Sequence, residues 1–271
     1  MTSSDQSKAA SNADGELLYE VRNGIGLITF NRPEARNALT FRMYDRLAEI
    51  CATTPDDGTV KAIVLTGAGG RAFAAGTDIS LFRDFRSPEQ ALAYERRADE
   101  IFTAIEACPV PTIAAIAGAC TGGGAGIASC CDMRIATRDM RFGFPIARTL
   151  GNCLSAATLA RLVALIGEAR VIDLIYTARL IEAEEARSIG LVSELLDNHA
   201  AVMARAFSLA REIAGHAPLT LRITKELLRR LRGRNPKVDD SDLIVKAYTS
   251  ADFREGLEAF LAKRSPKWTG K

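Results

Sequence analysis

Glycine is concentrated in two segments of the chain, GAGGRAFAAGTD at residues 67–78 and GACTGGGAG at residues 118–126. Each segment follows a short apolar run, AIVL at 62–65 or TIAAI at 112–116, and such runs are typical of buried strands. Glycine lets a backbone approach a ligand closely, and free N–H groups at a helix N-terminus favour an anion. The two loops therefore predict convergence on one group that develops negative charge.

The glycine loops allow two other interpretations. Glycine also permits two backbones to pack closely, without any ligand. Residues 64–72, VLTGAGGRA, come close to the G-x-G-x-x-G/A fingerprint of dinucleotide-binding proteins, but Ser87-Pro88 begins a helix where the strand that binds the ribose should end. Neither glycine run ends in Gly-Lys-Ser/Thr, so the sequence contains no P-loop.

The composition is that of an average globular protein. Of 271 residues, 48% are hydrophobic and 25% are charged, which suits one large domain or one domain with an appendage. Lysine and arginine total 35 against 33 aspartates and glutamates, and these charges are interspersed. No strong field is therefore expected to attract nucleic acid or a membrane surface, and the expected partner is a small molecule.

Targeting and metal-binding motifs are lacking. Residues 1–15 have no apolar signal-peptide core and are interpreted as a disordered lead-in, which favours a cytoplasmic protein. The uncharged run 107–131 contains two prolines and three consecutive glycines, which favours strand, loop and buried helix over a membrane span. The six cysteines have no C-x-x-C spacing and are expected to be reduced thiols. His199 and His216 are too few for a three-histidine metal site and are interpreted as structural.

Local patterns place secondary structure along the chain. Two alternating runs flank Asn23-Gly24, which indicates a β-hairpin. Thr40 is a good N-cap for the amphipathic helix that follows it, and SPEQ at 87–90 has the cap residues of a long helix over 88–107. Further strands are expected at 133–136 and 191–195, and further helices at 123–131, 155–165, 168–176, 182–189, 199–215, 219–232, 239–250 and 252–263.

Strand–strand–helix units recur along the chain. This succession predicts an α/β fold, either a spiral of ββα units or a layered sheet, with a helical C-terminal appendage. The strand-rich and helix-rich parts divide near residue 200. The predicted organisation is thus a lead-in at 1–15, a core at 16–200 and a C-terminal helical region at 201–271.

Six short motifs occur in one order along the chain. They are FNRPEARNAL at 30–39, FAAGTDI at 73–79, GGG at 122–124 leading to CD at 131–132, Ala186 with GLV at 190–192, DFREG at 252–256 and KRSP at 263–266. Together they resemble the crotonase (enoyl-CoA hydratase/isomerase) family. The similarity covers about residues 16–268, which makes it far more specific than either glycine loop alone.

The resemblance implies a fold, an assembly and a substrate class. The fold is a crotonase-like spiral of ββα units, and the C-terminal helical region builds a homotrimer or a dimer of trimers. The substrate is an acyl-CoA thioester. No separate cofactor is implied, because coenzyme A is part of the substrate.

The resemblance also implies roles for residues of both glycine loops. The backbone N–H groups of Thr77 and Gly123 would hold the thioester oxygen, and such donors contribute about 3–4 kcal/mol each once that oxygen becomes an oxyanion. The substrate path would be lined by Arg36, Ala38, Leu39, Ala74, Ala75, Gly76, Asp78, Ile79 and Gly122. Lys263, Arg264 and Lys267 would meet the phosphates of coenzyme A or form a solvated basic tail.

One feature of the family's hydratases is missing. Those enzymes use two glutamates, and the matching positions here are Gly126 and Ile146. Neither residue can exchange a proton, so efficient hydration by that mechanism is not expected. Isomerisation, decarboxylation of a malonyl-type thioester and weak hydration remain open, since each passes through the same oxyanion. The alternative is a non-catalytic acyl-CoA-binding or assembly protein on the same fold.

Polar residues after the second missing glutamate are candidates to replace it. Arg148 would hold a substrate carboxylate, or else form a salt bridge between subunits. Asn152 would orient a substrate carboxylate, or else cap the next helix. Cys153 is interpreted as an inert thiol in preference to an acid or nucleophile. Asp78 is interpreted as an acceptor that fixes its loop in preference to the remaining acid.

Overall fold

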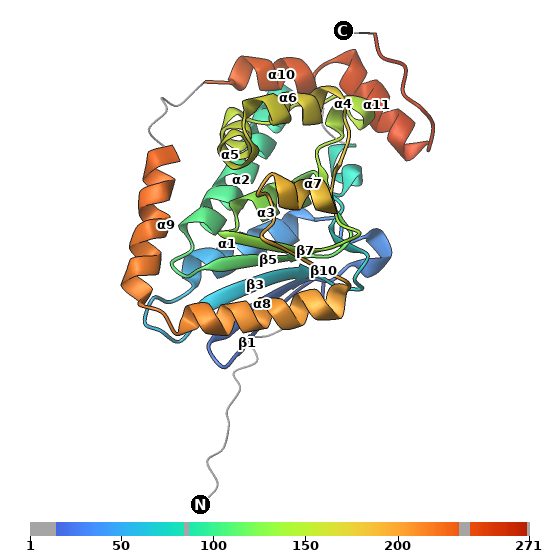
Figure 1. The fold of residues 1–271 in the computed structure, drawn as a ribbon. Helices are drawn as coiled ribbons and strands as arrows, with labels where there is room; N and C mark the ends of the chain where they lie inside the picture. Colours follow the sequence, from blue (N-terminus) through green and yellow to red (C-terminus); the bar gives the residue numbers. More distant parts are fainter. Residues whose placement is uncertain (1–14, 84–86, 233–238, 270–271) are drawn as a thin grey trace, which may run out of the picture.

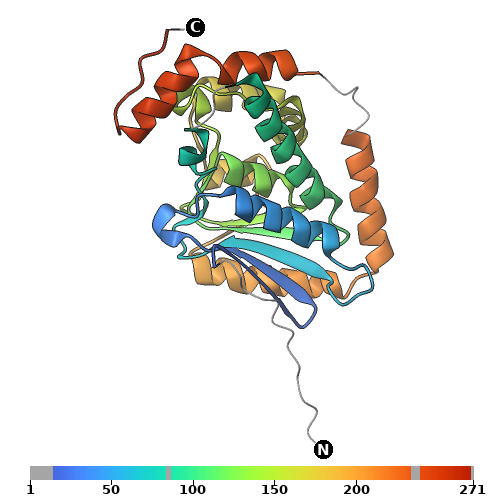
Figure 2. The same ribbon diagram turned by 180° about the vertical axis from the view of Figure 1, so that it is seen from behind.

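The computed structural model describes residues 15–83, 87–232 and 239–269, so the predicted lead-in lies outside the described residues except for Gly15. The strands form two sheets surrounded by helices (Figures 1 and 2). The larger sheet has the order β1 (Leu17–Arg22), β2 (Ile25–Phe30), β3 (Ala62–Gly67), β5 (Thr112–Ile116), β7 (Met133–Thr137) and β10 (Glu194–Leu196). The smaller sheet has the order β4 (Ala72–Ala74), β6 (Ala119–Thr121), β8 (Arg141–Gly143) and β9 (Ile181–Glu182).

The first two strands form the predicted hairpin. β1 and β2 are antiparallel, and the turn residues Asn23 and Gly24 both have positive φ, 52° and 76°, as a two-residue hairpin turn requires. From β2 onward the strands of the larger sheet are parallel. Every residue of β3 and β5 is buried, which explains why both strands are uncharged runs without polar alternation.

The core repeats a strand–strand–helix unit. In each unit the first strand joins the larger sheet, and the second joins the smaller sheet before the chain enters a helix. The units are β3–β4–α2 (Pro88–Ala107), β5–β6–α3 (Gly123–Cys130) and β7–β8–α4 (Ile146–Thr149), and the short 3-10 helix η2 (Ile79–Phe82) precedes α2. Helix α2 begins with the predicted capping box between Ser87 and Gln90. The predicted α/β spiral is confirmed.

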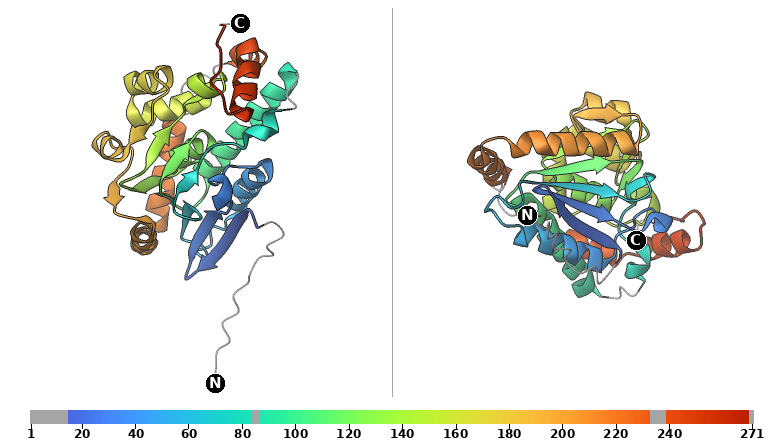
Figure 3. Two further views of the ribbon diagram at one scale, coloured as in Figure 1. Left: turned by 90° about the vertical axis from the view of Figure 1, so that its right-hand side faces the viewer. Right: turned by 90° about the horizontal axis from the view of Figure 1, so that it is seen from below.

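Helices cover both faces of the larger sheet. Helix α1 (Phe41–Thr53), capped by Thr40 as predicted, shares one apolar core with α2, α3 and one face of β3. Helix α8 (His199–Ala214) lies along the opposite face, where Val202 and Ala206 pack with Val64 and Ile113 (Figure 3, right). Helix α8 spans the predicted boundary at residue 200 and packs on the core. The next helix, α9 (Pro218–Arg232), no longer lies along the sheet.

The remaining elements follow the expected order. They are η1 (Pro33–Ala35), α5 (Ala156–Ile166), α6 (Glu168–Tyr176), α7 (Ala183–Ser188), α10 (Ser241–Tyr248) and α11 (Ala251–Leu261). The predicted strand at 191–195 is wrong in its first half, because β10 begins at Glu194. Leu191 and Val192 are buried in a loop, where the Leu191 carbonyl accepts from Nε of Arg134 at 2.8 Å. None of the helices in the described ranges is both long and apolar enough to span a membrane.

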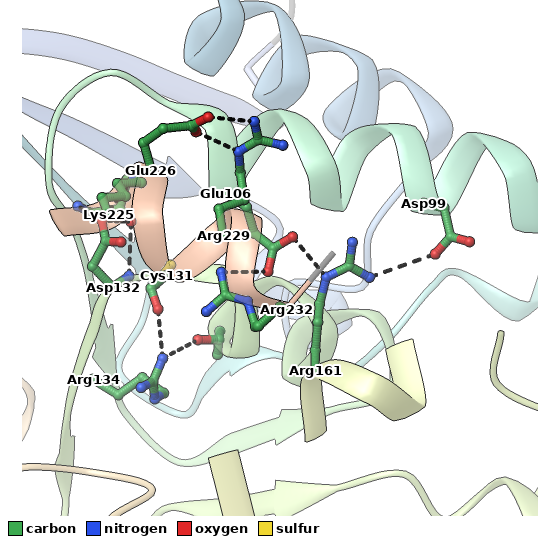
Figure 4. Close-up of polar contacts among 12 residues, drawn as sticks. Asp99, Glu106, Cys131, Asp132, Arg134, Arg161, Lys225, Glu226, Arg229 and Arg232 are labelled. Carbon is green, nitrogen blue, oxygen red and sulfur yellow. Dashed lines mark hydrogen bonds and ion pairs between the residues drawn. The ribbon is translucent and has the colours of Figure 1, made fainter. Parts of the chain in front are cut away.

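Helix α9 is attached to the core by ion pairs and by Leu221, which packs against the apolar cluster between α8 and the larger sheet. None of its residues is buried. The ammonium of Lys225 lies 2.7 Å from the carboxylate of Asp132, and the guanidinium of Arg232 lies 3.2 Å from Glu106, which also pairs with Arg161 (Figure 4). A stripe of α9 residues four positions apart is more than half exposed, namely Leu219, Ile223, Leu227 and Leu231. Within this monomer α9 therefore presents an uncovered apolar stripe.

Asn37 joins the segment before α1 to the first glycine loop. The residue is fully buried and adopts a left-handed backbone, with φ of 56°. Its Nδ2 donates to the carbonyl oxygens of Ala68 and Ala72, at 3.0 and 2.8 Å, and its Oδ1 accepts from the N–H of Arg32 at 3.0 Å. These bonds satisfy backbone groups that would otherwise be left unpaired, and they hold the two segments together.

Replacing Asn37 should show how much its hydrogen bonds contribute to the free energy of unfolding. Asn37→Gly loses the three hydrogen bonds but tolerates the left-handed backbone, and we expect it to lower the free energy of unfolding by about 3 kcal/mol. Asn37→Ala also strains the backbone and should cost about 1 kcal/mol more. Urea unfolding followed by circular dichroism measures both. A loss below about 1 kcal/mol in either variant would contradict this role for Asn37.

Candidate active site

The two glycine-rich segments contain neighbouring strands of the smaller sheet, β4 and β6. β4 and β6 are parallel, with Ala72 opposite Ala119. Because parallel strands end at the same edge of a sheet, the loops that follow them lie side by side. A Cβ atom placed on Gly76 would lie 3.5 Å from the carbonyl oxygen of Thr121 and 3.9 Å from the backbone nitrogen of Gly123. The loops thus converge as the sequence predicted.

Glycine is required where the second loop enters α3. A Cβ on Gly124 would lie 2.3 Å from the carbonyl oxygen of Ala74, and a Cβ on Gly123 would lie 1.9 Å from the hydroxyl of Tyr44. Cβ atoms in proteins do not approach other atoms this closely. The loops therefore pack at a distance that only glycine permits.

The N–H groups of Thr77 and Gly123 have no partner among the described residues. Leu39 forms a parallel bridge with Thr77: its N–H donates to Gly76 O at 2.8 Å, and its carbonyl accepts from the N–H of Asp78 at 2.9 Å. The N–H of Thr77 points away from this bridge. Gly123 is the first residue of α3, where N–H groups have no partner within the helix. In the part of the chain that the structure describes, neither N–H donates a hydrogen bond.

Both residues line a cavity of about 720 Å³. Most of the predicted substrate-path residues line it too, namely Arg36, Ala38, Ala75, Gly76, Asp78, Ile79, Gly122 and Asn152. Leu39 and Ala74 are fully buried and support the loops from behind. Much of the remaining wall is apolar, with Phe102, Phe144, Leu150, Leu154 and Leu180. The cavity can hold an apolar group next to two free amide donors.

Arg148 is not brought to the cavity. It is exposed on α4, whereas Ile146 and Thr149 of the same helix line the cavity wall. The orientation of this single helical turn directs residue 148 outward. The structure therefore gives no support to a contact between Arg148 and a substrate carboxylate in this cavity, and the alternative salt bridge between subunits stays a prediction.

Asp78 fixes its own loop. Its Oδ1 accepts from the N–H of Ser80 at 3.1 Å, which caps η2, and its Oδ2 lies 3.1 Å from Nη1 of Arg32. Partial burial pushes the pKa of Asp78 upward, but the hydrogen bonds from Ser80 and Arg32 outweigh it, so the pKa is lowered. The carboxylate is a poor proton carrier near neutral pH, and its predicted role as a loop-fixing acceptor is confirmed.

Asn152 and Cys153 line the cavity in the loop before α5. Nδ2 of Asn152 donates to the hydroxyl of Tyr248 at 3.1 Å. The alternative that Asn152 caps the next helix is wrong, because Ser155 is the N-cap of α5. Burial raises the pKa of the Cys153 thiol to about 12, so it remains protonated near neutral pH.

The other charged and histidine candidates do not line the cavity. Arg264 forms an exposed ion pair with Glu255 at 2.6 Å. His199 begins α8 and lies 3.3 Å from the hydroxyl of Thr66, and His216 is exposed. Within the described ranges, no group of three or more His, Cys, Asp or Glu side chains is placed to hold a metal ion.

The two positions at which the resemblance implies glutamates in the family's hydratases, Ile146 and Gly126, lie at and behind the cavity wall. Ile146 lines the cavity and is 8% exposed. Gly126 is buried in α3, where a Cβ would lie 2.5 Å from Cζ of Phe102, a wall residue. A side chain at position 126 would have to displace that ring. This part of the cavity wall is therefore apolar, because Ile146 and Phe102 fill it.

The cavity also contains polar side chains that were not predicted from the sequence, among them Tyr44, Tyr94, Glu95 and Tyr248. The hydroxyls of Tyr44 and Tyr94 lie 2.9 and 3.1 Å from Oγ1 of Thr77. The hydroxyl of Tyr248 donates to Oε1 of Glu95. A pattern that could have revealed Glu95 is its position on the buried face of α2, four residues after Ala91.

Glu95 is a buried carboxyl group, only 7% exposed. Burial raises its pKa to about 7, with further upward contributions from the charges of Asp99 and Asp240. The hydrogen bond from Tyr248 opposes this rise without cancelling it. Glu95 can therefore gain or lose a proton near neutral pH.

Comparison with known proteins identifies the family of this fold and site. The family model described as "Enoyl-CoA hydratase/isomerase" matches residues 20–271. The chain belongs to this family. It is 31% identical over 253 residues to the short-chain-enoyl-CoA hydratase of Clostridium acetobutylicum, which covers 92% of this chain and 95% of that protein.

Other members of the family carry different activities in their names. The 1,2-epoxyphenylacetyl-CoA isomerase of Escherichia coli is 31% identical over 263 residues, covering 94% of this chain and 98% of that protein. A solved structure of methylmalonyl-CoA decarboxylase superposes with a TM-score of 0.85 at 26% identity, covering 94% of this chain and 99% of the other. The chain is thus an enzyme of the hydratase/isomerase family with a crotonase fold.

The raised pKa of Glu95 predicts a measurable pH dependence of stability. The pKa of Glu95 is near 4.5 in the unfolded chain and about 7 in the folded chain, so the folded chain holds the proton more tightly. The resulting stabilisation is complete at a pH below 4.5 and is lost as the pH rises through about 7. The free energy of unfolding of the wild type should therefore fall, relative to that of Glu95→Gln, between these two pH values. Glu100→Gln, an exposed position on the same helix, should follow the wild type.

Urea unfolding at several pH values measures this difference for the three proteins. A constant difference between the wild type and Glu95→Gln from pH 4.5 to 7 would show that Glu95 is not raised in pKa by burial.

Proposed function

We propose that the cavity binds an acyl-CoA thioester and that the N–H groups of Thr77 and Gly123 hold the thioester oxygen. The observation that carries this proposal is the pair of free donors on adjacent loops that line one cavity. A thioester oxygen gains negative charge when an enolate or a tetrahedral adduct forms, and preorganised amides stabilise that charge. Backbone donors do not titrate, so this stabilisation is the same throughout the physiological pH range.

The cavity walls suit the two parts of such a substrate. The acyl group would occupy the apolar region beside Phe102, Phe144 and Ile146. The coenzyme A part would pass Arg36 and Ala38, which line the same cavity and match the family's substrate path. The thioester then lies between the two parts, at the amide donors.

The reaction is expected to be an isomerisation, a decarboxylation or a weak hydration. All three pass through an oxyanion, and named relatives include a hydratase, an isomerase and a decarboxylase. Efficient hydration by the two-glutamate route is disfavoured, since Gly126 and Ile146 cannot exchange protons. Gly126→Glu is not expected to restore it, because its side chain meets the ring of Phe102.

A matched pair of variants tests the donor at residue 123. Tyr44→Phe removes the hydroxyl that any Cβ at this position would meet. In that background Gly123→Ala keeps the N–H, and Gly123→Pro deletes it. Turnover of the best substrate in a panel of CoA esters, followed by mass spectrometry, should be about 10²–10³-fold lower with proline than with alanine. Equal turnover by the two folded variants would overturn the oxyanion assignment.

The same panel separates this proposal from the alternative of a non-catalytic binding protein. An enzyme converts at least one CoA ester, and the conversion depends on the residue 123 donor. A binding or assembly protein would bind CoA esters and convert none.

We also propose that the chain forms a homotrimer or a dimer of trimers. The support is the apolar stripe of α9, whose four leucine and isoleucine side chains are more than half exposed in the monomer. A patch of this kind is typically covered by another subunit.

Sedimentation velocity at micromolar concentration tests the assembly. We expect the mass of three or six chains of 29.2 kDa, and a smaller mass for Leu227→Lys combined with Leu231→Lys. A monomeric wild type would contradict the proposal.

A further inference from the structure

Among the described residues that line the cavity, two carry a carboxyl group, Asp78 and Glu95. The carboxylate of Asp78 already accepts a hydrogen bond from Ser80 and forms an ion pair with Arg32. Among the described residues, Glu95 forms no ion pair, and its only side-chain hydrogen bond comes from Tyr248. An enzyme that lacks the two family glutamates therefore keeps one uncommitted carboxyl group in its cavity.

The hydrogen bonds of Glu95 leave one oxygen available. Oε1 accepts from Tyr248, whose hydroxyl also accepts from Nδ2 of Asn152 at 3.1 Å. Oε2 accepts no hydrogen bond from the described residues. This oxygen is also not fully buried. The carboxyl group is thus held in place through one oxygen while the other remains accessible from the cavity.

Helix α2 places this carboxyl group in the wall of the cavity that the amide donors also line. Tyr94, the residue before Glu95, lies 3.1 Å from Oγ1 of Thr77 through its hydroxyl. Ala98 and Phe102 of the same helix also line the cavity. One face of α2 therefore forms a wall of the cavity whose apolar surface is interrupted by Glu95.

The groups around Glu95 favour a neutral carboxyl at low pH and an anion above neutrality. Asp99 of α2 and Asp240, the N-cap of α10, oppose its charge, and Tyr94 and Tyr248 contribute neutral hydroxyls. Arg161 of α5 is paired with Asp99 and Glu106. With its pKa raised to about 7, Glu95 matches the requirement for a group that both accepts and returns a proton.

We propose that Glu95 is the proton-transfer residue of this enzyme and acts on the acyl carbons next to the thioester. The proposal rests on the proposed function of the cavity. Oε2 takes a proton from the α-carbon, the C–H electron pair forms a double bond to the carbonyl carbon, and the carbonyl π pair moves to the thioester oxygen held by Thr77 and Gly123. The protonated Glu95 then returns the proton to the α-carbon, or to the γ-carbon of an unsaturated chain. Tyr248 and Asn152 are positioning residues.

Exchange of solvent deuterium into butyryl-CoA tests the proton transfer without knowledge of the net reaction. The wild-type protein in D₂O should incorporate deuterium at the α-carbon, as followed by mass spectrometry. Glu95→Gln should lower the rate about 10²–10⁴-fold while the Kd of butyryl-CoA, measured by calorimetry, changes less than about threefold. Glu95→Asp should recover part of the rate. Glu100→Gln, an exposed carboxyl on the same helix, should exchange as the wild type does.

The dependence of the exchange rate on pD distinguishes proton transfer from a structural role. The rate should rise with pD and level off above the pKa of Glu95. Tyr248→Phe removes the hydrogen bond that lowers this pKa, so the midpoint should move to higher pD. A structural role for Glu95 predicts loss of binding and no shift of the midpoint in Tyr248→Phe.

The outcomes separate the two proposals. Binding with exchange that needs Glu95 supports both. Wild-type exchange that persists in Glu95→Gln overturns the role of Glu95 and leaves the acyl-CoA function standing. Binding without exchange by the wild type also overturns the role of Glu95. Failure to bind any CoA thioester overturns the proposed function, and the role of Glu95 with it.

Discussion

Backbone contact between residues 74–77 and 121–124 is the constraint on which the site depends. The contact follows from the parallel pairing of β4 and β6, which delivers both loops to one edge of the smaller sheet. It leaves no room for a side chain at Gly124, and the hydroxyl of Tyr44 occupies the corresponding space at Gly123. It also places the first N–H of α3 next to the N–H of Thr77, which the Leu39 bridge turns away from other partners. A small local requirement for glycine thus sets the position of both donors.

Apolar side chains and one carboxyl group lie near these donors. Ile146 and Phe102 make the cavity wall beside Gly126 apolar, and Phe102 occupies the space that a side chain at Gly126 would need. Helix α2, which supplies Phe102, also carries Glu95, held by Tyr248 of α10. In our proposals the oxyanion is stabilised by the backbone and the proton is moved from α2. The carboxyl group that moves the proton would then lie on α2, and not at the positions that match the glutamates of the family's hydratases. The oxyanion site would be the same.

The C-terminal helices contribute to more than assembly. α8 completes the core by covering the second face of the larger sheet, and α10 packs on α2 and supplies Tyr248 to the cavity. Within the described ranges, only the stripe on α9 offers a run of exposed leucine and isoleucine side chains four residues apart. A boundary at residue 200 is therefore a change in secondary structure and not a division of the hydrophobic core.

Features with local causes could be predicted from the sequence. The hairpin at Asn23-Gly24, the cap at Thr40 and the capping box at Ser87 each depend on residues a few positions apart. The pairing of Glu95 with Tyr248 joins residues 153 positions apart and leaves no local pattern. The outward direction of Arg148 depends on how α4 packs, which spacing does not specify. The strand expected at 191–195 starts late because Leu191 and Val192 bond to Arg134 and Ala186 instead of a neighbouring strand.

The thioester oxygen of a bound substrate reports on the central claim most directly. Butyryl-CoA labelled with ¹³C at the thioester carbonyl can be observed by NMR in complex with the protein. Hydrogen bonds from Thr77 and Gly123, as proposed, would polarise the carbonyl. We therefore expect a downfield shift of its resonance on binding, and a smaller shift for Gly123→Pro than for Gly123→Ala in the Tyr44→Phe background. Butyryl-CoA that binds with an unchanged carbonyl resonance would contradict the account.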